Sequence, residues 1–217
     1  MIRQKIWKPG AVRLAGSDRY ARLVVYWLHC HYREAERSTL HATVTPVPVP
    51  FPQANNAMST DAVSTDQFKQ AMGLFPSGVT IVTTSVNEER FGFTASAFSS
   101  LSLSPPLILV CLANSADCFK PFNTGKQFAV NIIDEKYEEL AMKFATKGCD
   151  KFAGDEFIEG GVGLPVLPDT PVSLECRTKH VYPGGDHVIL VGEVEHLTLG
   201  TGLPTVWHAG GFRKLES

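Results

Sequence analysis

The stretch GFTASAFSSLSLSPPLILVCLA, residues 92–113, joins a run of small hydroxyl side chains to a short apolar run. Short apolar runs bounded by turn residues are typical of strands that are buried on both faces. Pro105 and Pro106 lack backbone donors and therefore end a strand ladder. We expect a return strand that begins in this stretch, a turn at residues 102–106, and a strand at residues 107–113 that is buried on both faces.

The segments on either side of this stretch favour more short strands and a few helices. Residues 79–86 are β-branched at most positions, which favours a strand, and NEER at residues 87–90 is a polar hairpin loop. Ser64 and Gln67 have the spacing of a capping box at a helix start. The remaining patterns predict strands at residues 128–133, 172–182 and 187–199, helices at residues 64–72, 116–123 and 134–145, and a long loop at residues 154–170. Many short strands, few helices and frequent turns indicate a small antiparallel barrel.

Composition limits the class of protein. A chain of 217 residues with 44% hydrophobic residues is long enough for one globular domain with or without an extension. No apolar run approaches the ~20 residues that a membrane span needs. The five cysteines form no CxxC pair and have no zinc-like spacing. We therefore expect a cytoplasmic protein with no membrane partner and no metal site.

Charge divides the chain near Met58. Residues 1–57 contain eight Lys or Arg and three Asp or Glu, whereas residues 58–217 contain twelve and nineteen. The alternating prolines of TPVPVPFP, residues 45–52, are typical of an extended linker. We expect residues 1–57 to be a basic, Pro-rich extension that is disordered or precedes the natural start, although an organellar presequence stays open. Residues 58–217 form the main domain, whose acidic balance argues against a nucleic-acid partner.

Two segments have the chemistry of a cofactor site. Alanine and short hydroxyl side chains at residues 94–97 let a ligand approach the backbone closely, and an apolar strand beside them is suited to a flat ring. GGDH, residues 184–187, combines two glycines that permit a tight turn with the imidazole of His187. Taken alone, both segments also fit structural roles, as a surface strand rich in serine and as a hairpin tip.

Four separated segments, GVTIVTT, GFTASAFSSLSLSPPLILVCL, FAVNII and GGDHVILVGEV, resemble the short-chain flavin reductases. These proteins are the reductase components of two-component flavin-dependent monooxygenases. The similarity extends from about residue 68 to residue 212. It implies a homodimeric FMN-binding split barrel that passes a hydride from NADH or NADPH to FMN or FAD and supplies a monooxygenase partner with reduced flavin.

The resemblance also implies roles for individual residues. Ser115 matches a position near the flavin phosphate, His187 matches the nicotinamide site, and Trp207 lies in a late segment near the flavin. Lys147 and Lys151 are further cations that we leave outside the predicted set. The predicted flavin wall consists of Thr94, Ala95, Ser96 and Ala97, followed by Ser99 and Ser100, and the strand end passing the isoalloxazine consists of Cys111, Leu112 and Ala113. We interpret the Cys111 thiol as a small apolar group, not as a nucleophile.

Two other classes of function stay open. A non-catalytic flavin-binding or electron-carrier protein of the same fold would keep the flavin wall without oxidising reduced nicotinamide. A split-barrel oxidase, such as one that acts on pyridoxamine phosphate, would need a more basic phosphate site. A Rossmann dinucleotide enzyme is disfavoured, because GGVGLP at residues 160–165 does not join a strand to a helix.

Overall fold

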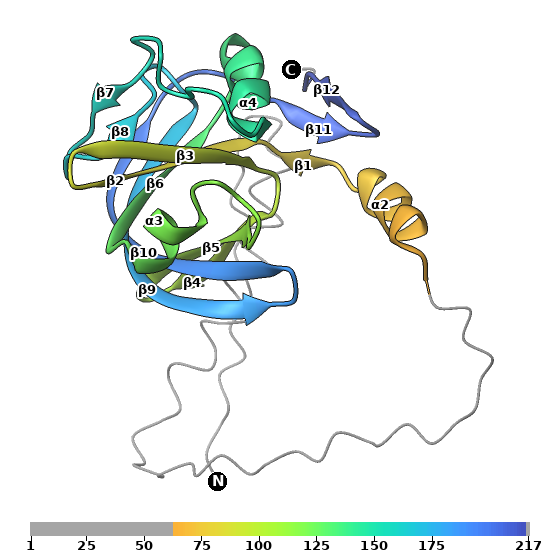
Figure 1. Cartoon of the computed structure of the whole chain (residues 1–217). Helices are drawn as coiled ribbons and strands as arrows, with labels where there is room; N and C mark the ends of the chain where they lie inside the picture. The colour runs from red at the N-terminus through yellow and green to blue at the C-terminus, as the bar shows by residue number, and fades with distance from the viewer. Residues whose placement is uncertain (1–62, 216–217) are drawn as a thin grey trace, which may run out of the picture. The chain divides into compact units, whose positions relative to one another are not determined.

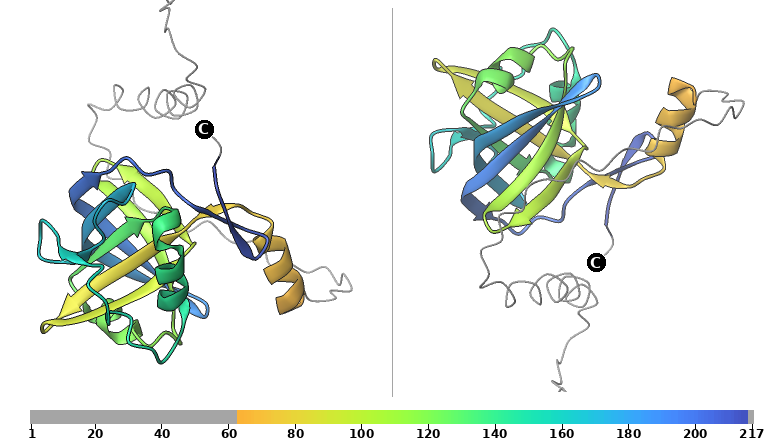
Figure 2. Two further views of the ribbon diagram at one scale, coloured as in Figure 1. Left: turned by 90° about the horizontal axis from the view of Figure 1, so that it is seen from above. Right: turned by 90° about the horizontal axis from the view of Figure 1, so that it is seen from below.

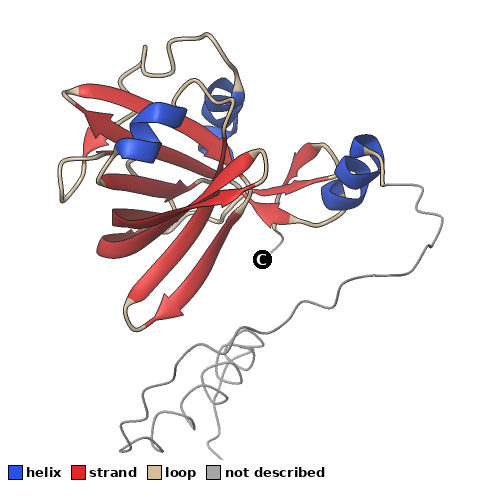
Figure 3. Cartoon of the chain, turned by 60° about the horizontal axis from the view of Figure 1, so that its bottom comes forward, coloured by secondary structure: helices blue, strands red, loops and turns tan. Residues whose placement is uncertain are grey.

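Seven antiparallel strands form the main sheet of the computed structural model, which describes residues 63–215 (Figure 1). Their order is β3-β2-β6-β9-β10-β5-β4. The seven strands are β2 (Thr80–Val86), β3 (Glu89–Ala95), β4 (Phe98–Leu103), β5 (Pro106–Ala113), β6 (Gln127–Ile132), β9 (Val172–Gly184) and β10 (His187–Leu199). The sheet curls around its core (Figure 2), and strands dominate the described part of the chain (Figure 3). The predicted mainly β, antiparallel barrel is confirmed.

The strands β3 and β4 are consecutive in the sequence but lie at opposite ends of the strand order. β3 pairs with β2 as far as Ala95, whereas β4 pairs with β5 from Phe98 onwards. The chain therefore crosses from one edge strand to the other at Ser96 and Ala97. The expected return strand is β3, and the residues that follow it form a separate strand, β4, with a different partner. The turn expected at residues 102–106 is confined to Ser104 and Pro105, because β4 continues to Leu103.

β5 also differs from its prediction. Its side chains alternate along the strand, so Ile108, Val110 and Leu112 are buried while Leu109 and Cys111 are only half-buried. The prediction that both faces are buried was therefore wrong. The half-buried face is the one that reaches the candidate site described below.

Two apolar clusters stabilise the barrel and attach one helix to it. The first fills the barrel and includes Phe93 and Phe122, whose rings meet edge to face at 5.0 Å. The second lies between α4 (Glu138–Ala145) and the sheet, where Phe144 packs against Ile81. α4 is thereby fixed against β3, the strand that carries the predicted flavin wall.

Two of the three predicted helices are shorter than expected, whereas the first has the expected length. The first is α2 (Thr65–Gly73), and it begins with the predicted capping box between Ser64 and Gln67. α3 (Phe119–Thr124) starts three residues later than expected. The segment predicted as one helix at residues 134–145 is divided into the 3-10 turn η1 (Glu135–Tyr137) and α4. None of the helices in the described part is long and apolar enough to cross a membrane.

A smaller sheet lies beside α2. It has the order β1-β11-β12, with β1 (Ser77–Gly78), β11 (Val206–His208) and β12 (Gly211–Arg213). The Ala209 N–H between β11 and β12 donates to the Gly73 carbonyl at the end of α2 over 2.8 Å. The predicted boundary at Met58 and the extension of residues 1–57 lie outside the described residues.

The long loop predicted at residues 154–170 contains one short hairpin, β7 (Ile158–Glu159) and β8 (Pro165–Val166). Its glycine-rich turn donates to the buried carboxylate of Glu175, from Gly161 N–H over 2.7 Å and from Val162 N–H over 3.0 Å. These backbone donors are therefore already used within the protein. This turn joins two strands, in keeping with the argument against a Rossmann loop.

Gly92 gives a testable link between packing and sequence. A Cβ atom there would overlap the Phe144 ring and lie 2.9 Å from the Val82 carbonyl oxygen. We expect Gly92→Ala to lower the free energy of unfolding by about 1–3 kcal/mol, because an overpacked core must shift. Urea denaturation measures this change. Gly78→Ala is the control, since no atom lies within 4 Å of the added Cβ, and equal loss in both variants would contradict the packing argument.

Candidate functional site

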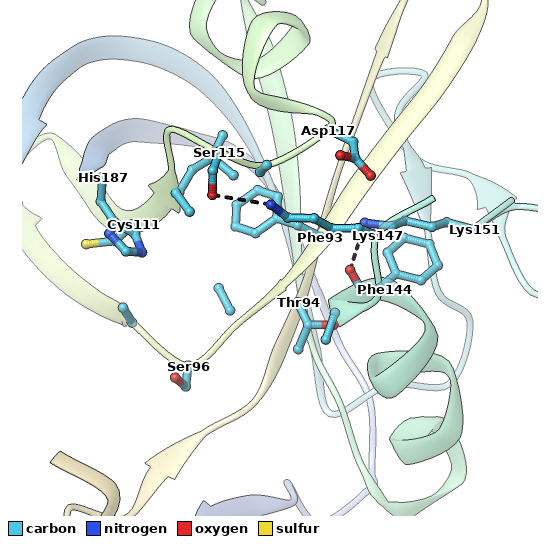
Figure 4. Close-up of a pocket in the computed structure, with 16 residues that line it drawn as sticks. Phe93, Thr94, Ser96, Cys111, Ser115, Asp117, Phe144, Lys147, Lys151 and His187 are labelled. Carbon is cyan, nitrogen blue, oxygen red and sulfur yellow. Dashed lines mark hydrogen bonds between the residues drawn. The ribbon is translucent and has the colours of Figure 1, made fainter. Parts of the chain in front are cut away.

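A pocket lies where the β3–β4 crossing, the end of β5, the start of β10 and the loop after α4 meet (Figure 4). It holds about 740 Å³ of empty space, part of which is open to solvent. Its lining comprises Phe93, Thr94, Ala95, Ser96, Ala97, Cys111, Leu112, Ala113, Ser115, Ala116, Asp117, Phe144, Ala145, Lys147, Lys151 and His187. Segments more than ninety residues apart in the sequence therefore surround one space.

The structure brings together all the predicted site residues except two. Ser99 and Ser100 lie on β4 beyond the crossing, where they are exposed and pair with Leu109 and Ile108 of β5. The Ser99 hydroxyl donates to the Ser100 carbonyl over 3.0 Å. Pairing with β5 carries the chain away from the pocket after Ala97, so these two serines do not line it.

The wall at the β3–β4 crossing consists of Thr94, Ala95, Ser96 and Ala97. The Thr94 hydroxyl donates to the Ala141 carbonyl and so anchors α4, and the Ala95 side chain is buried in the barrel core. Ser96 and Ala97 are exposed. Within residues 63–215 the backbone N–H groups of Ser96 and Ala97 form no hydrogen bond. They are two free donors for a carbonyl or a ring nitrogen of a ligand.

The adjacent wall is the end of β5. Leu112 points into the core and contributes backbone, while the half-buried Cys111 and Ala113 face outward into the pocket. Cys111 N–H donates to the Ala97 carbonyl over 3.0 Å and fixes the two walls to each other. Burial raises the pKa of the Cys111 thiol, which keeps it neutral. This wall is a narrow apolar shelf suited to a flat ring.

His187 lies across from Ala113 in the β5–β10 register and closes one side of the pocket. Its Nδ1 is 2.7 Å from an Asp186 carboxylate oxygen. That hydrogen bond, with the charge of the imidazole, lowers the pKa of Asp186. An ionised carboxylate only accepts, so Nδ1 carries the proton. Nε2 then remains available to a ligand.

Asn114 fixes the turn that carries His187. Its backbone N–H donates to the Asp186 carbonyl over 2.9 Å, and its Nδ2 donates to the Gly185 carbonyl over 3.3 Å. The end of β5 and the start of β10 are thus tied together. A ring lying on β5 and a group bound at His187 would be held at a fixed separation.

The opposite end of the pocket is cationic. The half-buried Lys151 donates from Nζ to the Gly92 carbonyl over 3.1 Å and to the Phe144 carbonyl over 2.8 Å. The exposed Lys147 reaches the Ser115 hydroxyl over 3.4 Å (Figure 4). Both lysines come from the loop after α4. Their position depends on how that loop packs, for which the sequence offers no local signal.

A second, more apolar pocket of about 560 Å³ adjoins the first and shares Thr94, Ser96 and Ala145 with it. Trp207 and Phe212 line it, and their rings meet edge to face at 5.0 Å. The late segment therefore lies beside the predicted flavin wall. Several residues that line the main pocket were not predicted from the sequence, namely Phe93, Ala116, Asp117, Phe144 and Ala145.

Comparisons with known proteins concern the same region. A family model described as the flavin reductase like domain matches residues 72–216. The actinorhodin polyketide dimerase of Streptomyces coelicolor is 42% identical over 151 residues, covering 67% of the chain and 84% of that protein. The NADH-dependent FMN reductase AsuE2 of Streptomyces nodosus subsp. asukaensis is 36% identical over 156 residues, covering 69% and 84%. The solved structure of the NADH:FAD oxidoreductase SgcE6 of Streptomyces globisporus, in complex with NAD and FAD fragments, matches with a TM-score of 0.67 and 33% identity, covering 72% and 98%. The matched segment of the family model contains every residue that lines the main pocket.

Proposed function

This chain belongs to the flavin reductase-like family, and from that premise we propose that it passes a hydride from NADH or NADPH to FMN or FAD. One observation carries the proposal. Free backbone donors at Ser96 and Ala97, the apolar end of β5 and the imidazole of His187 surround a single pocket. These are the groups that a flavin and a nicotinamide side by side require.

The residues present fit a flavin. An isoalloxazine has a flat apolar body, which matches the β5 wall, and polar ring atoms, which match the free N–H groups of Ser96 and Ala97. Its phosphate matches the end formed by Ser115, Lys147 and Lys151. A bound flavin would supply the hydride acceptor.

The protein's own task is alignment and charge stabilisation. The β5 wall and the crossing hold one ring, and His187 positions the second ring against it, so that the reacting atoms meet in a productive geometry. The N–H groups of Ser96 and Ala97 stabilise negative charge that develops on the flavin, because a preorganised donor costs no reorganisation during the reaction. The hydride transfer itself requires no side chain that acts as a general acid or base.

Oxidation of reduced nicotinamide with added flavin tests the proposal. We expect oxidation of NADH or NADPH that depends on FMN, FAD or riboflavin and saturates with the flavin. Comparison of the three flavins and two donors also defines the preferred pair. Flavin binding without any oxidation would overturn the reductase assignment in favour of a flavin carrier.

A second candidate rests on the relative at 42% identity, which is named a polyketide dimerase. In this alternative, the chain itself acts on a polyketide and joins two units. Mass spectrometry of products formed from a polyketide substrate in the presence of the purified chain and flavin distinguishes the two. A dimeric product together with no flavin-dependent oxidation of NADH or NADPH supports this candidate over the reductase.

We also propose that reduced flavin passes to a partner monooxygenase in the cytoplasm. The pocket is open to solvent, which suits release of the flavin. The described cysteines Cys111, Cys118, Cys149 and Cys176 are free, in keeping with a reducing compartment. Cell fractionation tests the location. A dialysis experiment that separates the chain from an oxygenase tests delivery, because product should still form if reduced flavin diffuses between them.

A second copy of this chain is the partner that we propose for α2. No residue of α2 is buried, and the apolar side chains of Phe68 and Met72 on this helix are 59% and 54% exposed; Phe75, two residues after its end, is 71% exposed. A helix with an exposed apolar face is stabilised by burying it against another surface. Light scattering should give a molar mass of twice 23.7 kDa. Met72→Glu should shift it toward the monomer and Lys69→Glu should not, and a monomeric wild-type chain would contradict the proposal.

A further inference from the structure

Asp117 is the one carboxylate among the described residues that line the main pocket. It lies at the end proposed for the flavin phosphate, together with Ser115, Lys147 and Lys151 (Figure 4). A carboxylate there repels a phosphate by simple Coulomb interaction. We therefore expect Asp117 to make another contribution to phosphate binding that outweighs this repulsion.

The contacts of Asp117 point to such a role. Its Oδ2 accepts a hydrogen bond from the Gly148 N–H over 3.0 Å. Gly148 has a φ of +68°, a left-handed conformation that glycine adopts without strain. Asp117 precedes α3, whereas Gly148 follows α4. The bond therefore ties together two loops that are distant in the sequence.

Lys147 immediately precedes this bonded turn. Its Nζ makes one contact among the described residues, the 3.4 Å hydrogen bond to the Ser115 hydroxyl. Lys151, in contrast, already donates to two backbone carbonyls. Lys147 is thus the lysine of this pocket with the most donors free for a phosphate. The long side chain of Lys147 has many rotamers, and it loses conformational entropy when a ligand binds. A fixed backbone at this residue makes that loss smaller.

We propose that Asp117 is a positioning residue for the flavin phosphate. By holding the Gly148 turn, it places the ammonium group of Lys147 beside Ser115, where a phosphate is bound. The bond from an amide to an ionised carboxylate is stronger than one between neutral groups, which suits a contact that must hold an exposed loop. This inference rests on the proposed function.

The distinguishing feature of this role is that it concerns only the phosphate. Riboflavin has the same ring and ribityl chain as FMN but no phosphate. Loss of the Asp117–Gly148 bond should therefore weaken FMN binding while leaving riboflavin binding nearly unchanged. General damage to the pocket would weaken both.

Titration of flavin fluorescence with the full chain measures both affinities. We expect Asp117→Ala to raise the Kd for FMN about tenfold, which corresponds to the loss of about one hydrogen bond, and to change the Kd for riboflavin by less than about twofold. Asp117→Asn keeps an acceptor oxygen and should restore most of the FMN affinity. Asp155→Ala, which removes an exposed carboxylate from the same loop region, is the matched control and should bind FMN like the wild type.

Lys147→Met completes the experiment. If Asp117 acts through Lys147, the double variant Asp117→Ala with Lys147→Met should bind FMN no more weakly than Lys147→Met alone. Tighter FMN binding by both Asp117→Ala and Asp117→Asn would overturn the inference and show that Asp117 only repels phosphate. An equal loss of FMN and riboflavin affinity would also overturn it. If the wild-type chain binds neither flavin, the proposed function itself fails, which is a different outcome.

Discussion

Ala113→Phe is expected to abolish flavin-dependent oxidation of reduced nicotinamide, with an increase of at least about a hundredfold in the Kd for FMN. Ala113 ends the apolar wall of β5 and lies across from His187 in the strand register. A phenyl ring at this position would occupy the space between the proposed flavin wall and the proposed nicotinamide site. Because Ala113 is only half-buried and faces outward, the larger side chain enters the pocket and not the barrel core.

A second variant distinguishes a blocked pocket from loss of the fold. Ala97→Trp fills the same pocket from the exposed crossing between β3 and β4, so it cannot overpack the core. Ala153→Phe adds the same ring as Ala113→Phe at an exposed loop position outside the pocket and is the control. Fluorescence titration with FMN gives the affinities, and thermal melting confirms folding. Wild-type affinity in folded Ala113→Phe and Ala97→Trp would place the flavin elsewhere.

The second large effect is expected at His187. His187→Ala should slow flavin reduction, or raise the KM for the reduced nicotinamide, by about ten- to a hundredfold, because a misplaced reactant loses most of the benefit of orientation. The Kd for FMN should change by less than about threefold, since the flavin walls are formed by other elements. Anaerobic stopped-flow spectroscopy separates reduction from binding.

A substitution at Asp186 tests whether the hydrogen bond to His187 contributes to this effect. Asp186→Ala removes the carboxylate that holds the proton on Nδ1 of His187, so it should reproduce part of the loss while the imidazole remains. His180→Ala is the matched control, because His180 is exposed and stacks on Tyr182 away from the pocket lining. An unchanged reduction rate in His187→Ala would reject the role of this residue.

Local sequence patterns were sufficient for most strands of the barrel. The β-branched run of β2 and the alternation of β9 and β10 around Gly185 each depend on neighbours in the chain, and these strands lie close to where they were predicted. The capping box at Ser64 is equally local. These signals are strong because propensity and turn chemistry act over a few residues.

The errors occurred where distant contacts decide the structure. The segment at residues 92–103 has one composition throughout, but its two halves pair with different strands, which is a long-range choice. The family resemblance implied that Ser99 and Ser100 belong to the flavin wall, but they lie on β4 outside the pocket. Asp117, Lys147 and Lys151 were missed or set aside for the same reason, because the loop after α4 reaches the pocket only in the folded chain.

The crystal structure of this chain with FMN bound is the most direct test of the central claim. We predict the flavin ring on the backbone of residues 111–113, with its polar edge toward the N–H groups of Ser96 and Ala97 and its phosphate beside Ser115 and Lys147. A second pocket adjoins the first, so the flavin ring has one other defined place in which it could bind. A flavin ring held instead between Trp207 and Ala141 in the second pocket would contradict the account.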